Sequence, residues 1–66
     1  MQLTINGAPH VSDGVLTLSA AVASLTTART GVAAAVNGEV VRRAEWDNTM
    51  LTDGDDVEVL TAVQGG

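Results

Sequence analysis

The chain has 66 residues and contains no cysteine, no lysine, no phenylalanine and no tyrosine. Without cysteine, neither a disulfide nor a thiolate metal site can stabilise the fold. The core must therefore be built from Val, Leu, Ile and Ala, with Trp46 as the one aromatic side chain. A domain of this size buries only about 60 % of its unfolded surface, so we expect a single domain of marginal stability.

Basic residues are also scarce, with three arginines against eight acidic residues and a net charge of −5. Three arginines cannot form the clustered basic face of a nucleic-acid-binding protein, and the aromatic platforms that stack on single strands are missing. A net negative charge favours association with a basic protein surface. We therefore expect a protein partner and no nucleic acid.

Long apolar runs are missing too, because no stretch approaches the roughly 18 residues that span a bilayer. The N-terminal segment Met1–Ile5 has no charged region followed by an apolar stretch, the pattern typical of a signal peptide. These features predict a cytoplasmic protein that does not associate with membranes.

Catalytic residues are not evident in the sequence. His10 is the one histidine and there is no cysteine, so no nucleophile–base pair is visible. The acidic residues Asp53, Asp55, Asp56 and Glu58 do not have the spacing of a twelve-residue calcium loop, and we interpret them as a solvated turn. Gly-rich phosphate loops are absent. We expect neither a resident metal nor a bound cofactor, and the chain is not predicted to be an enzyme.

The first half of the chain predicts a hairpin followed by a helix. Polar and apolar residues alternate over Gln2–Asn6, the pattern of a strand buried on one face, and Asn6-Gly7 suits a type I′ turn before an edge strand at Pro9–Val11. A helix of about ten residues then follows an N-cap at Thr17. Its apolar residues have amphipathic spacing: Leu18, Ala21, Val22 and Leu25.

The second half predicts three more strands and two turns. The expected segments are a strand at Val32–Val36, an Asn37-Gly38 turn, a strand at Glu39–Arg42, a helical turn at Ala44–Trp46, a turn at Asp53–Asp55 and a strand at Val57–Thr61. The order is thus β-β-α-β-β-β, with the first and last strands as parallel neighbours. This order predicts an α+β protein of the β-grasp (ubiquitin-like) class, with one main helix on a mixed sheet of about five strands. We expect the domain over residues 1–61 and a flexible C-terminal tail over residues 62–66.

Gly65-Gly66 ends the chain and is its most specific chemical feature. Neither residue has a Cβ, so the end can lie in a slot too narrow for other residues, and the terminal carboxylate is the group that reaches a partner's catalytic centre. A carboxylate becomes an acyl donor only after activation, for example by attack on the α-phosphate of ATP to give an acyl-adenylate. A sulfur nucleophile would then give a thiocarboxylate and an amine would give an amide. This chemistry leaves both outcomes open.

Several motifs together resemble the ThiS family, the sulfur carrier proteins of thiamine biosynthesis. The resemblance is strongest from Asn37 onward. The sequence differs from the family at Arg42, where members often have proline, and at Ser19-Ala20, where they often have an acidic residue. The motifs, in order, are Asn37-Gly38-Glu39-Val40-Val41, Arg43, Trp46, Asp53-Gly54-Asp55, Val57-Glu58-Val59-Leu60 and Ala62-Val63-Gln64-Gly65-Gly66.

The resemblance implies a co-substrate and not an enzyme. An E1-like adenylating enzyme of the ThiF type would use ATP and magnesium to activate Gly66, and a sulfur donor such as a cysteine desulfurase would supply the sulfur. A thiazole synthase of the ThiG type would then accept it. Val63, Gln64 and Gly65 would enter the partner's active site with Gly66. We expect docking through the apolar surface around the last strand, near Val59 and Leu60, one of which must be in the core.

Three alternatives remain. A MoaD-like carrier for molybdopterin synthesis has the same fold, but such chains tend to be longer, richer in phenylalanine, and to have prolines before the final glycines, whereas Ala62-Val63-Gln64 stands there in this chain. A ubiquitin-like modifier would be joined through Gly66 to a lysine of another protein. A plain interaction subunit would have an inert tail.

Overall fold

The computed structural model describes residues 1–28 and 30–61, so residues 62–66, expected to be the tail, lie outside the described part of the chain. The predicted order of strands and main helix is confirmed, and the helical turn predicted at Ala44–Trp46 is a longer 3-10 helix, Arg43–Asn48. In the described part, no helix is long and apolar enough to cross a membrane. The elements are β1 (Gln2–Ile5), β2 (Ala8–Val11), α1 (Leu18–Leu25), β3 (Val32–Val36), β4 (Glu39–Val41), η1 (Arg43–Asn48) and β5 (Asp56–Thr61).

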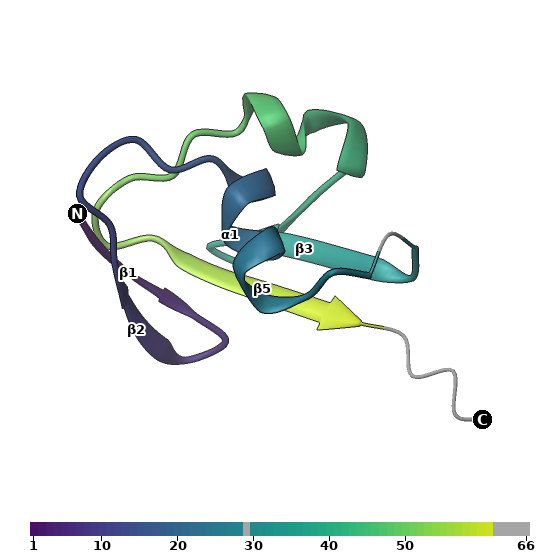
Figure 1. Cartoon of the computed structure of the whole chain (residues 1–66), viewed down its shortest axis with the longest axis horizontal. Helices are drawn as coiled ribbons and strands as arrows, with labels where there is room; N and C mark the ends of the chain where they lie inside the picture. The colour runs from purple at the N-terminus through teal and green to yellow at the C-terminus, as the bar shows by residue number, and fades with distance from the viewer. Residues whose placement is uncertain (29, 62–66) are drawn as a thin grey trace.

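The five strands form one mixed sheet in the order β2-β1-β5-β3-β4. β1 and β5 are parallel, and the other neighbouring pairs are antiparallel. β5 therefore lies at the centre of the sheet, with β2 and β4 at its edges (Figure 1). The mixed sheet with one main helix and parallel first and last strands confirms the predicted β-grasp architecture.

Two Asn-Gly turns connect β1 to β2 and β3 to β4, as predicted. The φ angles are 52° at Asn6 and 81° at Gly7, and 51° at Asn37 and 84° at Gly38. A type I′ turn requires positive φ at both central positions, because its twist then matches that of the strands it joins. Asparagine tolerates this conformation better than most residues, and glycine has no Cβ to oppose it. The local sequence thus determines both hairpins.

α1 begins where the sequence predicts but ends early. The Thr17 hydroxyl oxygen accepts a hydrogen bond from the Ala20 backbone N–H at 3.1 Å, which confirms the N-cap. The helix has eight residues and ends at Leu25, before the β-branched residues Thr26 and Thr27. The Thr26 hydroxyl accepts from the Ala28 N–H at 3.0 Å, a local bond that competes with helical pairing. Leu25, expected on the buried face, is 49 % exposed because the helix stops there.

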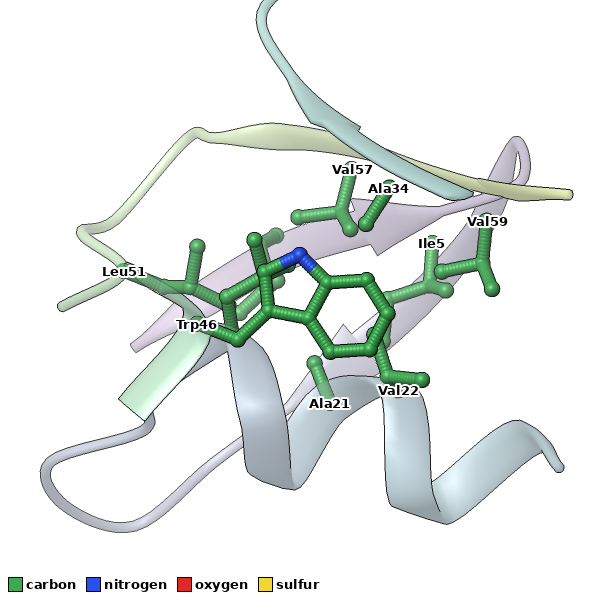
Figure 2. Close-up of a cluster of buried hydrophobic side chains, with 10 residues drawn as sticks. Ile5, Ala21, Val22, Ala34, Trp46, Leu51, Val57 and Val59 are labelled. Atoms are coloured by element: carbon green, nitrogen blue, oxygen red, sulfur yellow. The ribbon is translucent and has the colours of Figure 1, made fainter. Parts of the chain in front are cut away.

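The core lies between one face of the sheet and the helices α1 and η1. Leu18 and Val57 are completely buried, and Trp46 of η1 lies among side chains of α1 and the sheet (Figure 2). The indole N–H donates to the Val41 carbonyl oxygen at 2.9 Å, so the polar atom of this buried ring has a partner. The sequence expectation that Trp46 closes the core is confirmed. The other core residues are Leu3, Ile5, Ala21, Val22, Ala34, Leu51 and Val59.

The acidic turn before β5 is held by hydrogen bonds from its own carboxylates. Asp55 accepts from the Thr52 backbone N–H at 2.8 Å, from the Thr52 hydroxyl at 3.0 Å and from the Asn37 side-chain amide at 3.0 Å. Asp53 accepts from the Gln2 N–H at 2.6 Å, which ties the turn to β1. The bond from the Thr52 N–H does most to lower the pKa of Asp55 below its ordinary value; burial opposes it, and the side-chain bonds from Asn37 and Thr52 lower this pKa further.

These bonds predict a pH-dependent contribution of Asp55 to stability. Because the pKa of Asp55 is lower in the folded chain than in the unfolded one, its contribution is complete above the unfolded pKa and is lost as the pH falls through the folded pKa. Asp55→Asn should therefore be less stable than the wild type at neutral pH, and the difference should shrink as the pH falls below the pKa that Asp55 has in the unfolded chain. Urea unfolding followed by Trp46 fluorescence measures both.

The matched control is Asp13→Asn, which removes the same charge from an exposed loop position where the carboxylate makes none of these bonds. It should leave the shape of the stability–pH curve unchanged. A stability difference between Asp55→Asn and the wild type that stays constant from neutral to acidic pH would show that this account of the turn is wrong.

Candidate functional site

The residues expected to carry the chemistry, Val63, Gln64, Gly65 and Gly66, lie outside the described residues. The strand that leads to them, β5, is described throughout and ends at Thr61. Its register fixes where the chain leaves the sheet: Val57 lies opposite Val36 of β3, and Thr61 lies opposite Val32. The candidate site is therefore built here from β5, the groups that hold it, and the surface beside its end.

A side-chain amide holds the later half of β5 on the β1 side. The Asn6 backbone N–H donates to the Val57 carbonyl oxygen at 2.8 Å, after which the chain turns away at Gly7. The Asn6 side chain then continues the pairing: its Oδ1 accepts from the Val59 N–H at 2.8 Å, and its Nδ2 donates to the Val59 carbonyl oxygen at 3.1 Å. A primary amide has one acceptor and donors in one plane, as a peptide group does. Asn6 thus pairs with β5 one step beyond the end of β1.

The second turn asparagine has the matching role at the start of β5. The Asn37 N–H donates to the Asp56 carbonyl oxygen at 2.7 Å, and the Asn37 Oδ1 accepts from the Asp56 N–H at 3.0 Å. Ile5 at the end of β1 and Val36 at the end of β3 both lie beside Val57, so the two asparagines contact β5 from opposite sides, Asn6 at Val59 and Asn37 at Asp56. The sequence analysis assigned both asparagines to turn formation alone and missed these bonds. The Asn-Gly pairs were the available signal, but only the strand register shows what the side chains contact.

The two faces of β5 differ near its end. Val59 is 6 % exposed and lies in the core, whereas Leu60 is 69 % exposed on the outer face of the sheet. This resolves the expectation that one of the two must be core. Val40 of β4, which is 77 % exposed, lies on the same outer face. Between Leu60 and Val40, the small side chains of Ala33 and Ala35 form the floor of a depression of about 230 Å³.

Charge is distributed unevenly along β5 and the residues after it. Asp56 and Glu58 are exposed at the start of the strand. From Val59 to Gly66 the sequence has no ionisable side chain. Of the described residues that line the depression between Leu60 and Val40, Glu58 is the charged one.

The acidic residues and His10 do not form a metal site in the described part of the chain. Residues 1–28 and 30–61 contain no group of three or more His, Cys, Asp or Glu that could hold a metal ion. The acidic cluster is instead engaged in structure, with the Asp56 carboxylate accepting from the Thr4 hydroxyl at 2.9 Å and Asp53 and Asp55 bonded as described above. His10 lies half-exposed in the edge strand β2.

Arg42 and Arg43 belong to a different part of the molecule. β4 ends at Val41, Arg42 has extended backbone angles, and Arg43 is the first residue of η1, with its guanidinium 5.4 Å from the centre of the Trp46 ring. A hollow of about 430 Å³ lies over this ring, between the end of α1 and η1. No residue of β5 lines it, so it is separate from the candidate site.

Comparison with known proteins places the whole chain in one family. The model of the ThiS family matches residues 3–66. The crystal structure of the thiamine biosynthesis protein ThiS from Geobacter metallireducens is similar, with 39 % sequence identity, complete coverage of both chains and a TM-score of 0.78. A solution structure of a thiamine biosynthesis protein from the same organism also has 39 % identity, covers all of this chain and 88 % of that one, and has a TM-score of 0.79.

Comparison with curated proteins gives no match. The family match covers β1 to β5 and continues to the last glycine, and the structural match at 39 % identity covers every element described above. The chain belongs to the ThiS family.

Proposed function

We propose that the chain is a sulfur carrier that bears sulfur as a C-terminal thiocarboxylate on Gly66 and donates it to thiazole formation in thiamine biosynthesis. The observation that carries the proposal is the match to the ThiS family, which extends through Gly66. The similar protein from Geobacter metallireducens is described as a thiamine biosynthesis protein, which supports the pathway. The depression beside the end of β5 gives a partner enzyme a surface close to the proposed reactive end.

The proposed chemistry has two steps. In the first, an oxygen of the Gly66 carboxylate attacks the α-phosphorus of ATP, the bond to the bridging oxygen breaks, and pyrophosphate leaves. In the second, a sulfur nucleophile equivalent to hydrosulfide attacks the carbonyl carbon of the acyl-adenylate, the carbon–oxygen bond to AMP breaks, and a thiocarboxylate forms. The carrier supplies the carboxyl group, while an adenylating enzyme supplies ATP and magnesium.

The proposed partners follow from the family. An adenylating enzyme of the ThiF type carries out the first step, a cysteine desulfurase is the source of the sulfur, and a thiazole synthase of the ThiG type accepts it. Val63, Gln64 and Gly65 enter the partner's active site together with Gly66. We assign docking of the adenylating enzyme to the outer face of the sheet at Leu60, Val40 and the two alanines between them, because this apolar surface adjoins the end of β5.

Changes at the last glycine test the function. Incubation with the adenylating enzyme, ATP and a sulfur donor should add to the intact chain the mass difference of one oxygen replaced by sulfur. Deletion of Gly66 should abolish this species, because the carboxyl group is then one residue short of the reacting position, and Gly66→Ala should reduce it strongly, because a Cβ obstructs a narrow slot. Intact-protein mass spectrometry measures all three.

Gly14→Ala is the matched control, since a Cβ at this exposed loop glycine meets nothing within 4 Å. It should be converted as efficiently as the wild type. Absence of the thiocarboxylate from the wild type under these conditions would contradict the proposal. Gly66 found in an isopeptide bond to a lysine of another protein, with no thiocarboxylate, would support a modifier instead.

The docking surface is tested by Leu60→Thr. The side chain is 69 % exposed, so the substitution should change stability little, while the loss of an apolar anchor should raise the KM for the carrier in adenylation by about fivefold or more. The control is Val15→Thr, at a residue that is 78 % exposed and outside this surface. An equal KM for both variants and the wild type would place docking elsewhere.

A further inference from the structure

We propose that Asn6 is a positioning residue for the reaction of the C-terminal carboxyl group: its side-chain amide holds β5 at Val59, two residues before the strand ends, and thereby fixes the last part of the strand that leads to Gly66. The inference rests on the proposed function and deepens it. It assigns a role in the transfer reaction to a turn residue 60 positions away from Gly66 in the sequence.

The contacts of the last two-thirds of β5 carry the argument. On the β3 side, pairing continues as far as Thr61, which lies opposite Val32. On the other side, residue pairing between β1 and β5 ends at Ile5–Val57, and the two hydrogen bonds from the Asn6 side chain to Val59 are the contacts that extend it. Without the amide, the strand would be held on both sides only as far as Val57.

The position of Asn6 makes this contact specific. Its backbone has a φ of 52°, so the same residue must form the turn and present an amide towards Val59. Glycine would satisfy the turn without the amide, and aspartate would offer an acceptor to the Val59 N–H but no donor to the Val59 carbonyl oxygen at neutral pH. These two substitutions therefore separate turn formation from the contact with β5.

The size of the expected fall in turnover distinguishes loss of orientation from a mere lengthening of the free chain that leads to Gly66. Moving the last two-sided anchor from Val59 to Val57 lengthens the chain to Gly66 from seven to nine residues, which lowers the effective concentration of its end by less than about twofold. Loss of orientation at a reacting group can cost about 100-fold. A fall in turnover of more than about threefold is therefore beyond what a longer tether explains.

Asn37 provides a control within the same strand. It also stands first in an Asn-Gly turn, has a φ of 51°, and bonds through its amide to the backbone of β5, but at Asp56, the end remote from Thr61. Asn37→Gly removes a comparable contact from β5 and should cost stability, as Asn6→Gly does. If stability of the domain were the sole contribution of these amides, both substitutions would affect the reaction alike.

The experiment compares the full-length wild type, Asn6→Gly, Asn6→Asp and Asn37→Gly as substrates of the adenylating enzyme with ATP and magnesium. Pyrophosphate release is measured against carrier concentration, at a temperature where each variant is shown to be folded by circular dichroism. Hydrogen exchange at the Val59 amide is followed in parallel by NMR. Asn6→Gly should exchange faster there than the wild type and Asn37→Gly, because the acceptor of the Val59 N–H is removed, whereas Asn6→Asp keeps an acceptor for this N–H and loses the donor to the Val59 carbonyl oxygen.

We expect kcat to fall by more than about threefold in the Asn6 variants, with KM within about twofold of the wild type, since the docking surface is unchanged. Asn37→Gly should keep both constants within about twofold. The inference is overturned if kcat of the Asn6 variants falls by about threefold or less, or if Asn37→Gly shows the same fall. If the wild type itself releases no pyrophosphate, the proposed function fails and this inference fails with it.

Discussion

The fold depends on holding a central strand that is longer than both of its neighbours. β5 has six residues, whereas β3 has five and β1 has four, so the peptide groups at the two ends of β5 extend beyond the strands that flank it. Asn6 and Asn37 supply partners from opposite sides of the strand, Asn6 to Val59 and Asn37 to Asp56. The same two residues form the turns at which β1 and β3 end. Each asparagine therefore ends a neighbouring strand with its backbone and continues the pairing with β5 through its side-chain amide.

The two faces of β5 have different roles. Val57 and Val59 fill the core under α1 and η1, while Leu60 on the opposite face joins an apolar depression that we assign to docking. The residues that follow Thr61 in the sequence have no ionisable side chain. In the proposed function, the domain presents the carboxyl group of Gly66 and the partner enzyme supplies the catalytic groups.

Local patterns in the sequence were sufficient for most of the fold. Alternation located β1, Asn-Gly pairs located both hairpins, and Thr17 located the start of α1, because each signal acts within a few residues. The contact of Asn6 with Val59 spans 53 positions and depends on the register of β1 against β5, which no local pattern contains. Val59 and Leu60 are both apolar, so the sequence likewise could not show which of them faces the core. The roles of Val63 to Gly66 remain predictions from the family resemblance.

The edges of the sheet have a consequence for aggregation. β2 contains Pro9, which has no backbone N–H to donate, and β4 has only three residues, so both edges offer poor templates for a strand from another molecule. β5 lies two strands away from each edge. A chain that adds to the sheet by accident would thus extend it at β2 or β4 and leave β5, the strand that leads to the proposed reactive end, covered on both sides. The edge strands β2 and β4 protect against aggregation, whereas β5 leads to the proposed reactive end. A substitution in β2 or β4 that lowers aggregation therefore need not affect the proposed reaction.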